Sequence, residues 1–158
     1  MKLYHGSNME IDKPDLSRSK PFKDFGQGFY LSPGYEQAHA LAKQKPINYN
    51  PRAICDHLRT GRSNNKDFRS ANKIFDDYCE EWAQFVLLNR DRSHTHPAHT
   101  YDIVIGPIAD DGVTYQLRRY SMGDISMSRL IEELKYANGL TIQYYFGTEH
   151  ALSYLKKL

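Results

Sequence analysis

The stretch Gly26-Gln27-Gly28-Phe29-Tyr30-Leu31-Ser32-Pro33 contains the sharpest change of local structure in the sequence. Its glycines predict a bulge or a tight entry into a strand. Residues 26–31 predict that strand, in which Tyr30 points to the side opposite its two apolar neighbours. The Ser-Pro pair predicts a helix N-cap followed by proline at the first helical position. One face of the strand is therefore expected in the core, while Tyr30 faces solvent, another helix or a stacked ring.

Apolar periodicity predicts further strands and helices on both sides of this stretch. Strands are expected at 3–5, closed by a turn at Gly6-Ser7-Asn8, at 102–107, where the unbroken apolar run indicates a buried central strand, and at 141–146. Helices are expected from the Ser-Pro pair to about Lys45, around 78–89, from Met127 to a close at Asn138-Gly139, and after Thr148 as N-cap. Because strands and helices do not alternate strictly, the expected fold class is α+β, with helices packed around a mostly antiparallel sheet.

The stretch from 46 to 75 is the least regular part of the chain and predicts an exposed basic insertion, helical in parts. Its cations are Arg52, Arg59, Arg62, Lys66, Arg69 and Lys73. Such a run could contact a phosphate backbone. Since only Phe68 offers a ring for base stacking between residues 52 and 73, an exposed charged loop is the preferred interpretation.

Length and composition indicate a single domain over residues 1–158, with a net charge of +2 that says little about partners. Cys55 and Cys79 match no zinc or redox spacing and are expected as free thiols. The first residues contain no apolar segment of a signal peptide, and no apolar run approaches the length of a membrane span. We therefore expect a cytoplasmic protein without a membrane partner.

The segment Tyr4-His5-Gly6-Ser7 has two interpretations when it is taken alone. It could cradle a ligand, with the histidine as a hydrogen-bond donor, the glycine backbone as a surface for close approach and the serine hydroxyl for an amide group. It could equally be the end of a strand followed by a turn. The second interpretation is the more common one for a lone histidine of this kind.

The order of the two segments is more specific than either segment alone. Tyr-His-Gly-Ser, then Phe-Gly-x-Gly-Phe-Tyr before a helix, resembles the ADP-ribosyltransferases of the diphtheria-toxin and poly(ADP-ribose) polymerase branch. The whole chain, except the stretch from about 46 to 75, looks like the bacterial family known as domain of unknown function 3990. The residues that carry this resemblance are Tyr4–Ser7, Asp24–Leu31, Gln37-Ala38, Glu81–Phe85, Asn89-Arg90, Asp102–Asp111 and Gln143–Glu149.

The resemblance implies an ADP-ribosyltransferase-like split antiparallel sheet and NAD as substrate, with no metal. His5 would bond a ribose hydroxyl, the backbone of Gly6 and the hydroxyl of Ser7 would bond the carboxamide of nicotinamide, and Tyr30 would stack on the nicotinamide ring. The implied NAD-binding set is His5, Gly6, Ser7, Gly28, Phe29 and Tyr30. The implied catalytic set is His5, Tyr30 and Gln143.

Gln143 departs from the pattern of the polymerases, which have a glutamate on the matching strand. Cleavage of the nicotinamide–ribose bond builds positive charge on the ribose, as glycoside cleavage does. A carboxylate would stabilise that charge directly, whereas an amide offers a dipole and a hydrogen bond. Glu149 lies six residues further on and is a poorer candidate, because it begins a helix and favours the helix dipole there.

Three functions are compatible with this pattern. The first is transfer of a single ADP-ribose from NAD to an acceptor on a protein or nucleic acid, whereas growth of a polymer is not expected. The second is a catalytically inactive NAD-binding module. The third is a protein-interaction module, for instance the toxin of a toxin–antitoxin pair, whose partner would be an antitoxin protein; this third function is compatible with the first.

Three histidines and two acidic pairs are the other sites that the sequence suggests. His94, His96 and His99 surround Pro97, and imidazoles at these spacings in a proline-bearing loop have no set metal geometry, so a solvated loop is preferred. Glu80-Glu81 is interpreted as a solvated helix face and Asp110-Asp111 as a turn after a strand.

Overall fold

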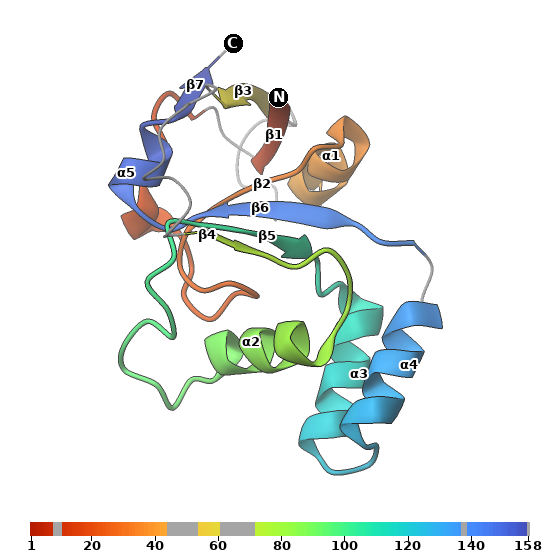
Figure 1. The fold of residues 1–158 in the computed structure, drawn as a ribbon. Helices are drawn as coiled ribbons and strands as arrows, with labels where there is room; N and C mark the ends of the chain where they lie inside the picture. The colour runs from red at the N-terminus through yellow and green to blue at the C-terminus, as the bar shows by residue number, and fades with distance from the viewer. Residues whose placement is uncertain (8–10, 44–53, 61–71, 137–138, 158) are drawn as a thin grey trace.

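The computed structural model describes residues 1–7, 11–43, 54–60, 72–136 and 139–157, which form two sheets with helices around them (Figure 1). Within these residues one sheet has three antiparallel strands in the order β1 (Lys2–Ser7), β3 (Ile54–Thr60), β7 (Leu155–Lys157). The other has four strands in the order β2 (Phe29–Leu31), β6 (Ile142–Phe146), β5 (Ile103–Pro107), β4 (Asn72–Ile74). Only the β4–β5 pair is parallel among the described strands, which confirms the expected α+β class with mostly antiparallel pairing.

Among the described residues, the two sheets meet at a bridge between β1 and the residue that follows β2. The N–H of Tyr4 donates to the Ser32 carbonyl and the N–H of Ser32 donates to the Tyr4 carbonyl, each over 2.8 Å. This pair of bonds holds the edge of the three-stranded sheet beside the edge of the four-stranded one.

Helices cover both ends of this arrangement. α1 (Tyr35–Lys43) packs on β1, and α2 (Glu80–Arg90) lies on the side of the four-stranded sheet away from β1 (Figure 1). α3 (Asp111–Ser121) and α4 (Met127–Tyr136) pack together beside α2. The short elements are η1 (Leu16–Arg18) and α5 (Glu149–Leu152), the latter with Thr148 as N-cap as expected. None of the helices in the described ranges has the length and apolar character that a membrane crossing demands.

Two apolar clusters form the core, and β2 separates them. Phe29 and Leu31 pack with Leu3 and Phe146 between the sheets, whereas Tyr30 packs against the cluster that contains Trp82 and lies around α2. The alternation predicted for residues 29–31 is therefore confirmed. The buried positions expected on α2, β5 and α4 are confirmed as well, since Val86, Val104 and Leu130 are fully buried.

Element boundaries near the N-terminus differ from expectation. β1 continues through Ser7, where the sequence predicts a turn, because Gly6 and Ser7 pair with Cys55 and Ile54 of β3. Ser32 is not an N-cap next to a helical proline: its backbone pairs with Tyr4, and α1 begins only at Tyr35. Gly26, with φ of 89°, makes the tight entry predicted before β2.

Two further expectations are wrong or incomplete. Asp110 is the N-cap of α3, where its carboxylate accepts from the N–H of Val113 over 2.9 Å, so Asp110-Asp111 begins a helix and not merely a turn. The basic stretch from 46 to 75 contributes β3 and β4, and residues 54–60 are a strand in the middle of a sheet, neither helix nor insertion. The remainder of that stretch lies outside the described residues, except Phe75, which is buried in the core.

Candidate functional site

A cleft of about 300 Å³ lies where β1, β2, α1 and β6 come together. His5 and Gly6 of β1, Tyr30 of β2 and Gln143 of β6 all line it. Four of the residues selected from the sequence are thus brought to one place by three strands of two different sheets. Its other lining residues are Tyr4, Lys23, Leu31, Ser32, Gln37, Ala38 and Ile108.

His5 is fixed in the cleft wall through one ring nitrogen and one ring face. Its Nδ1 lies 2.8 Å from the carbonyl oxygen of Tyr30, and its ring stacks on Phe29 with centroids 4.3 Å apart. A carbonyl only accepts, so Nδ1 carries the proton. In the neutral ring Nε2 is then an acceptor, which is the group that a ribose hydroxyl could donate to.

Gly6 lies where α1 approaches β1 most closely. A Cβ at this position would overlap the carbonyl oxygen of Ala38, so only glycine allows this contact. Backbone groups of alternate strand residues point to the same side, and those of Tyr4 point to Ser32. The N–H and C=O of Gly6 therefore point away from β3, to the side of the strand on which the cleft lies.

Tyr30 presents its ring to the cleft, while its hydroxyl is bound to the glycine turn before β2. The hydroxyl donates to the Gly26 carbonyl over 2.7 Å and accepts from the Phe25 N–H over 3.1 Å. Burial, and secondly the nearby charge of Asp24, raise the pKa of Tyr30 well above its ordinary value of 10.0. The phenol therefore stays protonated and is no general base. Its ring already attracts a cation, since Lys23 Nζ lies 4.7 Å from the ring centroid.

Gln37 brings an unsatisfied polar group to the same cleft. Its Oε1 lies 2.7 Å from the Ser32 hydroxyl, whereas its buried Nε2 has no hydrogen-bond partner among the described residues. If the amide were turned round, the oxygen would be the unsatisfied atom. In either orientation one end of the amide is buried without a partner among the described residues, and leaving such a group unpaired is costly.

Three residues expected in the site do not line this cleft. Ser7 is buried at the end of β1. Gly28 lies against Tyr145, whose ring a Cβ at that position would overlap. Phe29 points into the apolar cluster between the sheets and supports the His5 ring from behind. Phe29 therefore supports the wall of the cleft from outside it, whereas Gly28 packs against Tyr145, away from the lining residues.

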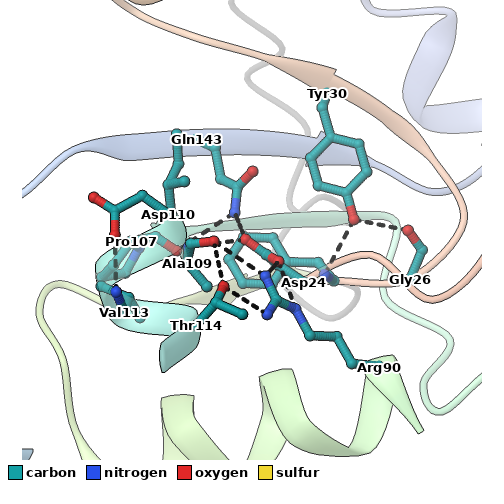
Figure 2. A network of polar contacts seen from close by, with 12 residues as sticks. Asp24, Gly26, Tyr30, Arg90, Pro107, Ala109, Asp110, Val113, Thr114 and Gln143 are labelled. Atoms are coloured by element: carbon teal, nitrogen blue, oxygen red, sulfur yellow. Dashed lines mark hydrogen bonds and ion pairs between the residues drawn. The ribbon is translucent and has the colours of Figure 1, made fainter. Parts of the chain in front are cut away.

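Gln143 is buried, with 8% of its surface exposed, and its amide is oriented by two acceptors. Its Nε2 donates to Asp24 Oδ2 over 2.9 Å and to the Pro107 carbonyl over 3.4 Å. A carboxylate and a carbonyl can only accept, so the NH₂ group must face them. Figure 2 shows the consequence: the amide nitrogen points to Asp24 and the amide oxygen points away from it.

Asp24 is the centre of a buried polar network that the sequence did not single out as a site (Figure 2). Its Oδ1 accepts from Arg90 Nε over 3.0 Å and from Arg90 Nη2 over 2.5 Å, and its Oδ2 also accepts from the Ala109 N–H over 2.9 Å. Arg90 further donates to the Thr114 hydroxyl and the Ala109 carbonyl. The network joins the loop before β2, α2, the start of α3 and β6.

A wider groove of about 500 Å³ adjoins the cleft and shares Lys23, Tyr30, Ile108 and Gln143 with it. Asp24, Arg90 and Arg92 line its far part, beside Phe22. Tyr30 and Gln143 thus line both depressions.

The remaining candidates lie elsewhere. His94 and His96 are exposed, as a solvated loop predicts, but His99 is half-buried and bound to the Phe25 carbonyl, so the solvated interpretation is wrong for it. Within the described ranges no three histidine, cysteine, aspartate or glutamate side chains are grouped to hold a metal ion. Glu149 is exposed at the start of α5 and lines a separate depression with Asp12 and Leu152.

Asp24, Arg90 and Gln37 are the residues of the site that sequence reasoning missed. Each lies inside a segment that carried the family resemblance, so a signal was present. No local pattern connects them, however, since Asp24 and Gln143 are 119 residues apart in the chain.

A comparison with known families gives one match. The family model described as protein of unknown function (DUF3990) matches residues 1–157. No curated protein and no solved structure matches the chain.

Proposed function

We propose that this chain, which belongs to the family of proteins of unknown function DUF3990, is a mono-ADP-ribosyltransferase with an ADP-ribosyltransferase-like fold. The geometry of its cleft supports this proposal. The protein would bind NAD and transfer ADP-ribose to a protein or nucleic-acid acceptor. The observation that carries the proposal is the meeting of His5, Gly6, Tyr30 and Gln143 in one cleft.

The polar groups of the cleft suit the nicotinamide end of NAD. The positively charged pyridinium ring would stack on Tyr30, whose face already attracts the Lys23 ammonium, and Lys23 would move aside on its flexible stem. The carboxamide would bond the backbone of Gly6. His5 Nε2 would accept from a ribose hydroxyl.

The proposed reaction breaks the bond between the nicotinamide nitrogen and the ribose C1′ carbon. Nicotinamide leaves with the bonding electron pair, which neutralises its ring, and positive charge develops on the ribose. An acceptor oxygen or nitrogen forms the new bond to C1′ and loses its proton to solvent. The oxygen of the Gln143 amide, turned away from Asp24, would stabilise the developing charge as a fixed dipole.

NAD binding without turnover is the second candidate function, and the neutral side chain at position 143 favours it. An amide lacks the full negative charge that would stabilise an oxocarbenium-like ribose. Calorimetry that detects NAD binding, together with no release of nicotinamide, would support this second candidate over the first.

The experiment that tests the proposal is incubation with NAD labelled in its adenylate part, with and without cell extract. We expect release of nicotinamide and labelled macromolecule, both lost in the Tyr30→Ala variant. The matched control is Tyr136→Ala, since this tyrosine is 81% exposed on α4. Absence of both products in the presence of extract, with no NAD binding, would contradict the proposal.

A role as the toxin of a toxin–antitoxin pair is a proposal about the biological setting of the same activity. We expect expression without its antitoxin partner to arrest growth and Tyr30→Ala to relieve the arrest. Arrest that persists in the variant would separate toxicity from the cleft.

A further inference from the structure

The surroundings of Gln143 favour an amide over a carboxylate at this position. The two atoms that its side chain meets, Asp24 Oδ2 and the Pro107 carbonyl oxygen, are acceptors. An amide nitrogen has two N–H groups for them, whereas an ionised carboxylate has none. A glutamate here would bring its negative charge against that of Asp24 in a buried site, where like charges are strongly unfavourable.

Arg90 is not available to neutralise a second carboxylate. Its Nε and Nη2 bind Asp24, its Nη1 binds the Thr114 hydroxyl, and its Nη2 also reaches the Ala109 carbonyl. The network therefore contains one positive charge, one negative charge and one neutral amide, with the donors and acceptors matched. Only a change at two positions would move the negative charge to residue 143 and keep the total charge of the network.

We propose that Asp24 is a positioning residue of the site, which fixes the amide of Gln143 with its oxygen turned to the cleft. The charged group of the site is then Asp24, and Gln143 is its neutral partner, not a glutamate that has been lost. A carboxylate that accepts from the NH₂ of an amide also polarises that amide and strengthens its oxygen as an acceptor. The functional part of this inference rests on the proposed reaction, whereas the pairing of Asp24 with Gln143 does not.

The pairing predicts how the two positions respond to exchange of their charges. Gln143→Glu alone places two carboxylates side by side. Asp24→Asn with Gln143→Glu restores the total charge. The new amide at position 24 then donates to the new carboxylate at position 143, while its oxygen still accepts from Arg90. In the double variant the Ala109 N–H loses its acceptor and the Pro107 carbonyl loses the bond from residue 143, and relief of the repulsion between two buried carboxylates is expected to outweigh these two losses. The double variant is therefore expected to be more stable than the single Gln143→Glu variant.

The first experiment is a double-mutant cycle of urea unfolding on the wild type, Asp24→Asn, Gln143→Glu and the double variant. We expect a favourable coupling of about tenfold in the unfolding equilibrium constant, as for residues within one network. If the Gln143→Glu variant does not fold and the double variant does, this is the same result in a stronger form. Additive effects, or a double variant no better folded than Gln143→Glu, would overturn the pairing. This cycle needs no NAD, so it stands apart from the proposed function.

The matched control replaces a carboxylate at the other end of β5. Asp102 lies just before β5 and accepts from the Thr148 hydroxyl, whereas Gln143 pairs with Gly106 near the far end of that strand. Asp102→Asn combined with Gln143→Glu should give additive effects. Coupling as large as that of Asp24 would show a general effect of charge and would count against a specific pair.

The second experiment tests whether Asp24 acts through Gln143. In the wild-type background Asp24→Asn is expected to lower kcat for nicotinamide release about tenfold, with a smaller change in KM. The reason is that the Gln143 amide is no longer held by a carboxylate and can rotate. In a Gln143→Ala background the same substitution should leave kcat unchanged. An equal loss of kcat in both backgrounds would overturn positioning through Gln143, even with the stability coupling intact.

Discussion

The hydroxyl and the ring of Tyr30 perform two different tasks. Its hydroxyl holds the turn of residues 25–26, and its ring forms part of the cleft wall. Because the raised pKa keeps the hydroxyl protonated, the turn retains the bond donated to Gly26 across the ordinary pH range. The ring face is the part of the side chain that a ligand can use.

Substitutions at Tyr30 should separate these tasks. Tyr30→Phe removes both hydroxyl bonds and should lower the free energy of unfolding by about 1–2 kcal/mol, while NAD still binds to the ring. Tyr30→Ala should abolish NAD binding. Urea unfolding and calorimetry on the same two variants measure the two effects, and loss of NAD binding in Tyr30→Phe would mean that the hydroxyl contacts the ligand.

His99 should make the stability of the protein depend on pH. Its Nε2–H donates to the Phe25 carbonyl over 2.8 Å, and its Nδ1 accepts from the Tyr101 N–H over 3.1 Å. Burial lowers the pKa of His99 below its ordinary value of 6.5. The unfolded chain then binds the proton more readily, so stability falls as pH falls through 6.5 towards the lower folded value.

Replacement of His99 tests this pH dependence. His99→Gln should flatten the slope of unfolding free energy against pH from about pH 6.5 downwards, the range between the ordinary histidine pKa and the lowered folded one. The exposed His96→Gln should leave that slope unchanged. The measurement is urea unfolding at several pH values. If the slope persists in the His99→Gln variant, the pH dependence comes from another group.

At the scale of elements, the contact of α1 with β1 sets the width of the cleft. Gly6→Ala places a methyl group against the Ala38 carbonyl, and the helix must move away. We expect a loss of about 1–3 kcal/mol in unfolding free energy, as for overpacking elsewhere, together with weaker NAD binding. Gly34→Ala, at the start of the same helix, meets only ordinary contacts and is the matched control. Equal tolerance of both changes would contradict the proposed contact.

The elements that could be predicted from the sequence are those with a strong local period. α2, β5, α4 and the alternation of β2 follow from apolar spacing, and the Thr148 cap follows from its residue type. β3 mixes charged and apolar residues without alternation, so it gave no strand signal. α3 was missed because its adjacent aspartates indicated a turn, although Val113 and Leu117 lie four residues apart and are both buried.

The candidate site, too, could be predicted from the sequence only in part. His5, Gly6, Tyr30 and Gln143 were selected through their segments, and the cleft contains all four. Ser7 was selected as well, yet continuation of β1 buries it. The Asp24–Gln143 contact was out of reach because it depends on how the loop before β2 meets β6, which only the assembled fold determines.

Across the whole molecule, Arg90 and Asp24 link parts of the chain that are far apart in sequence. Their bond joins the loop before β2 to α2 over 66 residues, and the same guanidinium binds Thr114 of α3. Such a link couples the cleft wall to the helical layer beneath the sheet. Removal of this link should therefore lower the stability of the protein beyond the site itself.

Arg90→Ala tests this link. It leaves the largely buried carboxylate of Asp24 without its cation, and we expect a loss of about 2–4 kcal/mol in unfolding free energy, near the lower end of values for a broken buried pair because the Arg90 side chain is 26% exposed. Arg92→Ala, in the exposed loop that follows α2, is the control and should change stability little. Equal effects of the two substitutions would mean that the Asp24–Arg90 network does not stabilise the protein.

We expect the cleft between β1, β2 and β6 to bind the nicotinamide end of NAD. A crystal structure of the protein soaked with NAD measures this most directly. We expect the nicotinamide ring on Tyr30, its carboxamide at the backbone of Gly6, and the Gln143 oxygen beside the ribose with its nitrogen still on Asp24. NAD bound elsewhere, or no NAD in a cleft left open by the crystal, would contradict it.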